Sequence, residues 1–216
     1  MQVFLREAES MRRSRSEAAE TRERILSTAS KMFLEKGLES VGMRDIMSAA
    51  GLTPGGFYRH FESKEELIAE ANRAAFDRLL AMFETQTAGM QAAEALDRIV
   101  WLYLNQSQGE GNSFRCPLSM IGGELSHCEP QVRAVAVDGY QRLVQLVADR
   151  LTDLGRDDVL TTASGVVSTM TGAVMLANIA GDKAAGRSIL SNAHAAIKAL
   201  LSPVAGIAKV GRRAKS

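Results

Sequence analysis

The stretch Met43–Leu67, MRDIMSAAGLTPGGFYRHFESKEEL, decides the fold of this chain. It contains two short helical segments on either side of Gly51, which follows two alanines and can adopt the left-handed backbone conformation that ends a helix. Thr53 then offers a hydroxyl as N-cap, and Pro54 fits the first helical position, where its missing N–H is not needed. The segment therefore predicts a helix–turn–helix.

The second of these helices, expected at Pro54–His60, has an unusual composition for a stable helix. Gly55 and Gly56 each lower helix stability by roughly 1 kcal/mol relative to alanine. They are understandable if the start of the helix must approach another surface closely, with backbone N–H groups directed at anions. Phe57 and Phe61, four residues apart, are expected to form its buried anchor.

Hydrogen-bond donors follow the two glycines: Tyr58, Arg59, His60 and, further on, Lys64. Ser63 and Glu66 have the spacing of a capping box, so Lys64 lies in the first turn of the following helix. A cation there opposes the helix dipole, and an external phosphate would explain it better. The pattern predicts a DNA-recognition helix flanked by phosphate contacts.

These residues resemble a known family. The run AAGLTPGGFYRHFESKEEL is similar to the N-terminal DNA-binding domain of TetR-family transcriptional regulators. The earlier run TRERILSTASKMFLEKGLESV (Thr21–Val41) resembles the family's first helix and the glycine that ends it. The resemblance implies an all-helical homodimer that binds a pseudo-palindromic operator and releases it when a small effector enters the C-terminal domain.

On this interpretation, one group of residues faces the bases or the DNA backbone: Thr53, Gly55 and Gly56. A second group, Tyr58, His60 and Lys64, holds phosphates, and Arg59 is a further donor. Arg44, in the first turn of the preceding helix, is a candidate phosphate or base contact, with a solvated surface arginine as the alternative.

Composition is that of an ordinary globular protein: 216 residues, of which 46% are hydrophobic and 24% are charged. The formal net charge of +1 excludes a strongly basic polyanion binder, so DNA contacts must come from a local arrangement of charges. The presence of only two cysteines favours a reducing compartment. The first ten residues lack the apolar segment that a signal peptide requires. We therefore expect a cytoplasmic protein.

Four regions are predicted along the chain: a flexible arm (1–16), a helix–turn–helix DNA-binding domain (17–66), a helical ligand-binding and dimerisation domain (67–205) and a tail (206–216). The arm carries Arg6, Arg12, Arg13 and Arg15. It is either a solvated, disordered end or a basic arm that reaches the minor groove or phosphates. Met11 would also be a normal start for this family, a hypothesis that the intact mass of the native protein tests.

The predicted fold class is all-α, because apolar residues recur at helical spacing and no alternating strand pattern is present. Helices are expected at Glu17–Lys36, Met43–Ala50, Pro54–His60, Glu65–Thr87, Ala92–Gln108, Pro117–Ser126, Pro130–Leu154, Asp157–Ala180 and Lys183–Leu201. The fourth of these would link the DNA-binding domain rigidly to the second domain. It could therefore convert a small shift in the second domain into altered spacing of the DNA-binding domains of the two subunits.

The last two helices carry many small residues, such as Gly165 and Gly172 in one and Ala193 and Ala196 in the other. Small side chains permit close helix approach, so we expect these helices to form a four-helix dimer interface, with two helices from each subunit, called the dimer seam below. The alternative is that the two helices pack together in the core of a single subunit. The stretch Val159–Gly181 is uncharged, but its Ser, Thr and Asn residues make membrane insertion costly. A helix buried between subunits explains it better.

The sequence lacks the common catalytic motifs: there is no glycine-rich phosphate loop, no G-x-S-x-G elbow and no His-x-x-x-His pair. His60 belongs to the predicted recognition helix, and His194 has no carboxylate at helical spacing. A metal site from Cys116, His127 and Cys128 fits no standard zinc spacing, and an ordinary helix terminus is the alternative. We predict no catalytic residue, no metal and no cofactor.

Cys116 stands at the expected N-cap of the helix that Pro117 opens, next to Arg115. A thiolate there would feel the positive helix end and the guanidinium, a setting that lowers the pKa of a thiol. The segment FRCPLSMIGGELS also resembles the corresponding part of family members that sense electrophiles or oxidants through a cysteine, although only Cys116 and Glu124 match that group. Cys116 is thus a candidate sensor, with a small buried residue as the alternative.

An effector pocket is expected among the aromatic residues and methionines of the second domain: Phe83, Trp101, Tyr103, Phe114, Met120, Tyr140 and Met170. The alternative is that these residues form a plain core. Two other function classes are possible. An all-helical small-molecule binder or enzyme would fail to shift intergenic DNA, and a membrane-associated protein would pellet with membranes. Neither explains two glycines inside a recognition helix.

Overall fold

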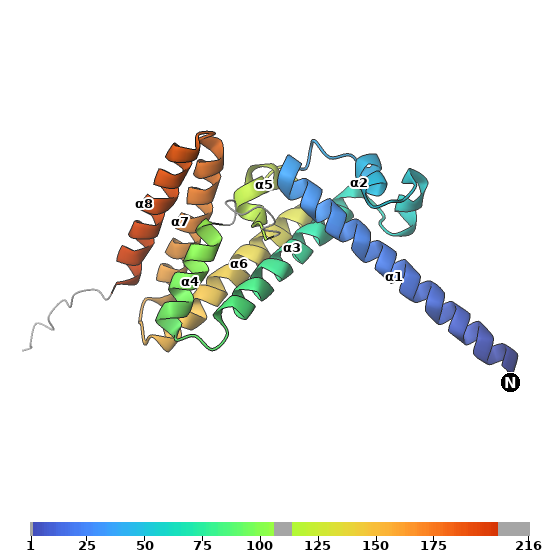
Figure 1. Cartoon of the computed structure of the whole chain (residues 1–216), viewed down its shortest axis with the longest axis horizontal. Coiled ribbons are helices and arrows are strands. Elements are labelled where there is room, and N and C mark those ends of the chain that lie inside the picture. Colours follow the sequence, from blue (N-terminus) through green and yellow to red (C-terminus); the bar gives the residue numbers. More distant parts are fainter. Residues whose placement is uncertain (1, 106–113, 203–216) are drawn as a thin grey trace, which may run out of the picture.

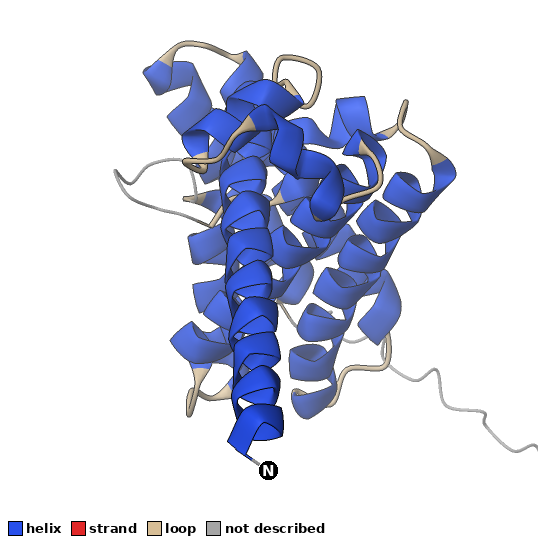
Figure 2. Cartoon of the chain, turned by 90° about the vertical axis from the view of Figure 1, so that its right-hand side faces the viewer, coloured by secondary structure: helices blue, strands red, loops and turns tan. Residues whose placement is uncertain are grey.

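The computed structural model describes residues 2–105 and 114–202, with side chains from Arg15 onward. All regular secondary structure of the described residues is helical, which confirms the predicted fold class (Figures 1 and 2). The elements in chain order are α1 (Gln2–Lys36), α2 (Met43–Ala49), the 3₁₀-helix η1 (Pro54–Arg59), α3 (Lys64–Thr87), α4 (Ala92–Leu104), α5 (Pro117–Leu125), α6 (Pro130–Asp153), α7 (Val159–Ile179) and α8 (Lys183–Leu201).

Helix α1 is longer than the sequence pattern predicted, because it begins at Gln2 rather than at Glu17. Residues 2–16 are thus helical rather than irregular, and the flexible arm stays a prediction. No glycine or proline interrupts α1, and its first half is rich in Arg, Glu and Ala, which favour helix. Arg15 is exposed, whereas the side chains of Arg6, Arg12 and Arg13 and the predicted tail lie outside the described part.

An N-terminal core joins α1, α2, η1 and the first half of α3. The apolar stripe of α1, including Ile25, Ala29 and Phe33, is buried against residues of the following helices, as the spacing predicted. Helices α5 and α6 also enter this core through Ile121, Leu125, Val132 and Ala136. The predicted DNA-binding unit and the rest of the chain are consequently joined, because the two parts share buried apolar surface.

Helix α3 passes through both halves of the molecule and runs beside α6 (Figure 1). Its first turns belong to the N-terminal core, whereas Leu79 and Phe83 belong to the core of the C-terminal domain. At Gly139 of α6 an added Cβ would lie 2.4 Å from the ring of Phe76, so only glycine leaves room for this ring between the two helices. The ion pair Arg142–Asp77, 2.7 Å between Nη1 and Oδ1, adds a polar contact between them.

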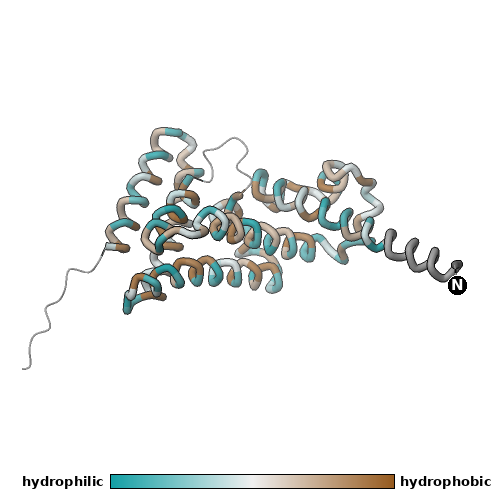
Figure 3. Tube along the Cα trace, turned by 60° about the horizontal axis from the view of Figure 1, so that its bottom comes forward, coloured by the Kyte–Doolittle hydropathy of each residue, from teal (hydrophilic) through white to brown (hydrophobic). Residues whose placement is uncertain are grey.

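The C-terminal domain is formed by α4 to α8 with the second half of α3. Apolar and polar residues alternate around its helices, as the brown and teal segments of Figure 3 show. Helix α7 is the one described helix long and apolar enough to cross a membrane. It packs between α6 and α8, with Val166, Met170 and Val174 fully buried. These contacts bury one face of α7 in the core of the C-terminal domain.

Candidate nucleic-acid interface and effector region

The turn between α2 and η1 has the conformation that the sequence predicted. Gly51 has φ of +72° and follows Ala50, the C-cap of α2. The N–H of Leu52 donates to the carbonyl of Met47 at 2.9 Å and closes the turn. Thr53 occupies the N-cap position of η1, but its hydroxyl makes no capping hydrogen bond. The predicted position is therefore confirmed, whereas the predicted role of its hydroxyl in capping is wrong.

Two phenylalanines anchor the recognition segment, defined here as residues 53–60. Phe57 and Phe61 are both buried, with stacked rings whose centroids are 5.7 Å apart. Tyr58 packs edge-on against Phe57 but is 69% exposed. One side of η1 is thus fixed in the N-terminal core, and the other side faces solvent.

The predicted DNA-contact residues lie on or beside this open side. Arg44, Thr53, Gly55, Tyr58 and Arg59 are exposed, and Gly56, His60 and Lys64 are partly buried. A Cβ added at Gly55 would meet nothing within 4 Å, and one at Gly56 would make ordinary contact with Met47. Internal packing therefore does not require glycine at either position. A close approach from outside the chain stays the prediction for both glycines.

Lys64 has an internal partner that the sequence pattern did not indicate. Its ammonium group donates to the carbonyl of Leu38, in the turn after α1, at 3.0 Å. The hydroxyl of Ser63 accepts from the N–H of Glu66 at 3.1 Å, which is one half of the predicted capping box. The other half is replaced, because the carboxylate of Glu66 accepts from the N–H of Glu62.

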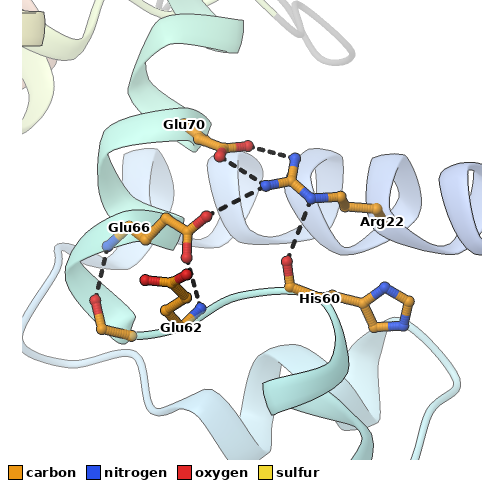
Figure 4. Close-up of polar contacts among 6 residues, drawn as sticks. Arg22, His60, Glu62, Glu66 and Glu70 are labelled. Carbon is orange, nitrogen blue, oxygen red and sulfur yellow. Dashed lines mark hydrogen bonds and ion pairs between the residues drawn. The ribbon is translucent and has the colours of Figure 1, made fainter.

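Sequence patterns missed Arg22, which organises the polar contacts around the end of η1 (Figure 4). Its guanidinium binds Glu70, with 2.6 Å between Nη2 and Oε1, and lies 3.5 Å from Glu66. Its Nε donates to the carbonyl of His60 at 3.3 Å, while the imidazole of His60 points away from the cluster (Figure 4). The guanidinium also covers the ring of Phe61 at 4.5 Å. Sequence separations of 38 to 48 residues leave no local pattern from which these contacts could have been found.

The predicted effector residues separate into two sets. Phe83, Tyr103 and Met170 are fully buried in the C-terminal core, and Phe114 and Tyr140 pack against it. Trp101 is 47% exposed on α4, where the guanidinium of Arg98 lies 4.9 Å from its ring centroid. Met120 packs instead against the N-terminal core. The fold thus brings five of the seven residues together as core.

Polar groups meet in this core at the start of α5. The hydroxyl of Tyr103 lies 3.0 Å from Oγ1 of Thr171 and also hydrogen-bonds with Cys116 and Ser119. Cys116 is the N-cap of α5, as predicted, but it is fully buried. Burial raises the pKa of its thiol, and the hydrogen bond from Tyr103 offsets this only in part. The predicted low pKa is therefore wrong, because desolvation outweighs the helix terminus.

Cys116 and Cys128 lie at opposite ends of α5, so the metal site considered from their spacing does not form. Within the described ranges, no group of three or more His, Cys, Asp or Glu residues could hold a metal ion. Partial burial and the carboxylates of Glu124, Glu65 and Glu129 raise the pKa of Cys128.

The fold and the open recognition segment define a helix–turn–helix DNA-binding protein. Residues 25–71 match the family model described as bacterial regulatory proteins, tetR family, and residues 92–189 match the LmrA/YxaF-like C-terminal domain of transcriptional regulators. The transcriptional regulator UidR of Escherichia coli K12 is 30% identical over 138 residues, which are 64% of this chain and 68% of UidR. The repressor BepR of Brucella suis is 28% identical over 193 residues, covering 80% of this chain and 87% of BepR.

Solved structures agree on the fold. Reduced NemR from Escherichia coli superposes with a TM-score of 0.75 at 22% identity, covering 87% of this chain and all of NemR. A TetR regulator from Chloroflexus aurantiacus has a TM-score of 0.72 at 26% identity and covers 85% of this chain and 96% of that one. The chain belongs to the TetR family of DNA-binding transcriptional regulators, whose members are not enzymes and typically dimerise through the C-terminal domain.

Proposed function

We propose that this regulator is a cytoplasmic repressor that holds a pseudo-palindromic operator as a homodimer and releases it when an effector enters the C-terminal domain. The observation that supports this most directly is the recognition segment. Its glycines have no internal packing partner that requires them, while Thr53, Tyr58 and Arg59 face solvent. The description of BepR as a repressor supports repression rather than activation.

In the proposed complex, Thr53, Gly55 and Gly56 face bases or the DNA backbone in the major groove. Tyr58, His60 and Lys64 hold phosphates, and Arg44 and Arg59 are further donors on the exposed face. Lys64 would exchange the carbonyl of Leu38 for a phosphate or contact both.

The proposed dimer uses one face of α7 and α8. Leu160, Leu176 and Ile179 of α7 are 64%, 55% and 72% exposed in the single chain, and Leu200 of α8 is 45% exposed. Water would contact these side chains in a monomer, whereas a second copy would bury them. The predicted small residues beside them, such as Gly172, which has open space around it, permit close approach.

The proposed effector is a small, mainly apolar molecule that occupies the C-terminal domain near Tyr103, Phe83 and Met170. All three side chains are buried in that core, where the rings of Phe83 and Tyr103 stack with centroids 6.4 Å apart. The hydroxyls of Tyr103 and Thr171 add polar groups at one point. A ligand there would have to displace packed side chains, so binding would be coupled to movement of α4, α5 or α7.

A second candidate is a thiol-reactive effector that modifies Cys116. The hydrogen bond between Cys116 and Tyr103 favours it, because this bond lowers the pKa of the thiol and so stabilises the thiolate that would attack an electrophilic carbon. Burial opposes it by raising the pKa of the thiol at rest. Cys116→Ser decides between them: unchanged operator release by electrophiles would remove the sensor role and leave the small-molecule effector.

The test of the proposed function begins with footprinting of genomic DNA bound by the full chain. We expect short palindromic sites near promoters, protected by a dimer. Release assays with candidate metabolites and electrophiles follow on those sites. A purified protein that is monomeric and indifferent to every duplex would contradict the proposal.

A further inference from the structure

A carboxylate of the C-terminal domain contacts the backbone of the DNA-binding domain. Glu124 lies near the end of α5, and its Oε2 accepts from the N–H groups of Leu38 at 2.7 Å and Glu39 at 3.1 Å. Both acceptor bonds are charge-assisted, a stronger class than neutral hydrogen bonds. More than 80 residues separate the partners along the chain, so the contact links two domains rather than neighbouring turns.

The turn after α1 is shaped for this carboxylate. Gly37 has φ of +87° and ends α1, with its N–H bonded to the carbonyl of Phe33 at 2.9 Å. A Cβ at Gly37 would lie 2.7 Å from Oε1 of Glu124, closer than side chains tolerate. Glycine thus provides both the left-handed backbone and the space that Glu124 occupies.

The same turn is held from its other side by the first turn of α3. Lys64 donates to the carbonyl of Leu38, so the N–H of Leu38 binds α5 and its C=O binds α3. Apolar packing surrounds these bonds, because Leu38 shares the N-terminal core with Ile121 and Leu125 of α5. Figure 1 shows α5 beside this end of α1.

We propose that Glu124 is a positioning residue that couples α5 to the DNA-binding domain and sets the orientation in which two recognition segments meet an operator. The inference rests on the proposed function. Helix α5 begins at Pro117, directly after its N-cap Cys116 in the C-terminal core, and ends just beyond Glu124, so a shift at its start displaces the carboxylate at its other end. Losing that acceptor frees the amides of Leu38 and Glu39 and allows α1 and α2 to reorient.

Amide exchange on the full chain without DNA tests the contact itself. Glu124→Ala should speed exchange at Leu38 and Glu39 at least tenfold, whereas Glu124→Gln, which keeps an acceptor oxygen at the same reach, should have a smaller effect. Glu124→Asp should resemble Glu124→Ala, because its carboxylate is one methylene shorter. Glu129→Gln, an exposed carboxylate beyond the end of α5, is the matched control. If Glu124→Ala left amide exchange at Leu38 and Glu39 at the wild-type rate, the carboxylate would not hold these amides and the proposal would be overturned.

Operator binding tests the coupling. The wild-type chain first selects duplexes from random DNA, and the variants are then measured on those duplexes. We expect Glu124→Ala to bind about tenfold more weakly, to discriminate less against one base pair inserted between the half-sites, and to keep the same base preference within each half-site. Glu124→Gln should show a smaller loss, and it serves as the test if Glu124→Ala does not fold.

Failure of the proposed function and failure of the Glu124 coupling give different results in these experiments. A wild-type chain that selects no duplex overturns the proposed function and, with it, the coupling to operator binding. A wild-type chain that binds DNA, together with Glu124 variants that lose amide protection but keep wild-type affinity and spacing discrimination, overturns the coupling alone. A general loss of stability would instead lower base-specific and spacing-specific binding together, and thermal unfolding of each variant would reveal it.

Discussion

Arg22 of α1 and Glu70 of α3 form a two-pronged ion pair, in which each terminal nitrogen of the guanidinium donates to one carboxylate oxygen. The same guanidinium bonds the carbonyl of His60 and covers Phe61. The end of the recognition segment is therefore fixed by charged groups that lie outside it. This arrangement sets the angle between η1 and the two longer helices that carry it.

Glu70→Gln should remove a pH-dependent contribution to stability. The hydrogen bond from Arg22 lowers the pKa of Glu70 from its ordinary value of 4.5. A lowered folded-state pKa means that the ion pair stabilises the fold above that ordinary value and stops doing so as the pH falls through the folded-state pKa. We expect Glu70→Gln to lower the free energy of unfolding by about 1 kcal/mol at neutral pH.

Urea unfolding of both chains across acidic and neutral pH measures this effect. The difference between them should shrink as the pH falls below 4.5, the ordinary pKa of the carboxyl. Glu84→Gln, at an exposed position of the same helix, should show no such trend. A difference that did not change with pH would show that Glu70 acts by packing rather than by charge.

Gly55→Ala and Gly51→Ala should separate DNA contact from folding. Gly51 has φ of +72°, so alanine there should lower the free energy of unfolding by about 1 kcal/mol. Gly55 has open space around it and no positive φ, so alanine should leave thermal stability equal or slightly higher. Operator affinity should nevertheless fall in Gly55→Ala, as a titration with labelled duplex would show. Wild-type affinity in this variant would contradict close DNA approach at Gly55.

Lys64→Ala should weaken operator binding to a similar extent on different sequences and flatten the dependence of log K on log salt by about one unit. Lys183→Ala, an exposed cation on α8, should leave the slope unchanged. Substitutions at Thr53 or Gly56 should instead change sequence preference. An unaltered slope in Lys64→Ala would show that the ammonium group of Lys64 bonds only the carbonyl of Leu38 and contacts no phosphate.

Leu176→Asp should convert the dimer into monomers, because a carboxylate cannot be buried without a partner in an apolar seam. Val137 on α6 is the matched control, since both side chains are 55% exposed in the single chain. Sedimentation equilibrium should therefore give a monomer for Leu176→Asp and a dimer for Val137→Asp. The reverse pattern would move the seam from α7 and α8 to the face of α6.

The sequence predicted much of the local structure because its signals are local. Gly51 ends α2 with a positive φ, Ser63 caps α3, and the last helix has the predicted limits Lys183–Leu201. The long first helix was missed where no capping or breaking residue marks its start. The Cys116 pattern gave the correct N-cap but the wrong pKa, because burial of that thiol depends on α4 and α7, which no local motif describes.

By itself, the sequence determined the helices, the helix–turn–helix and the residues that face DNA in the proposed complex, since periodicity, caps and glycines act within a few residues of one another. Only the tertiary structure decided which distant groups meet: Arg22 with Glu70, Lys64 with the carbonyl of Leu38, and Glu124 with the amides beside it. Those pairs are separated by 26 to 86 residues, and only the packing of α1, α3 and α5 into one shared core brings them within hydrogen-bond distance.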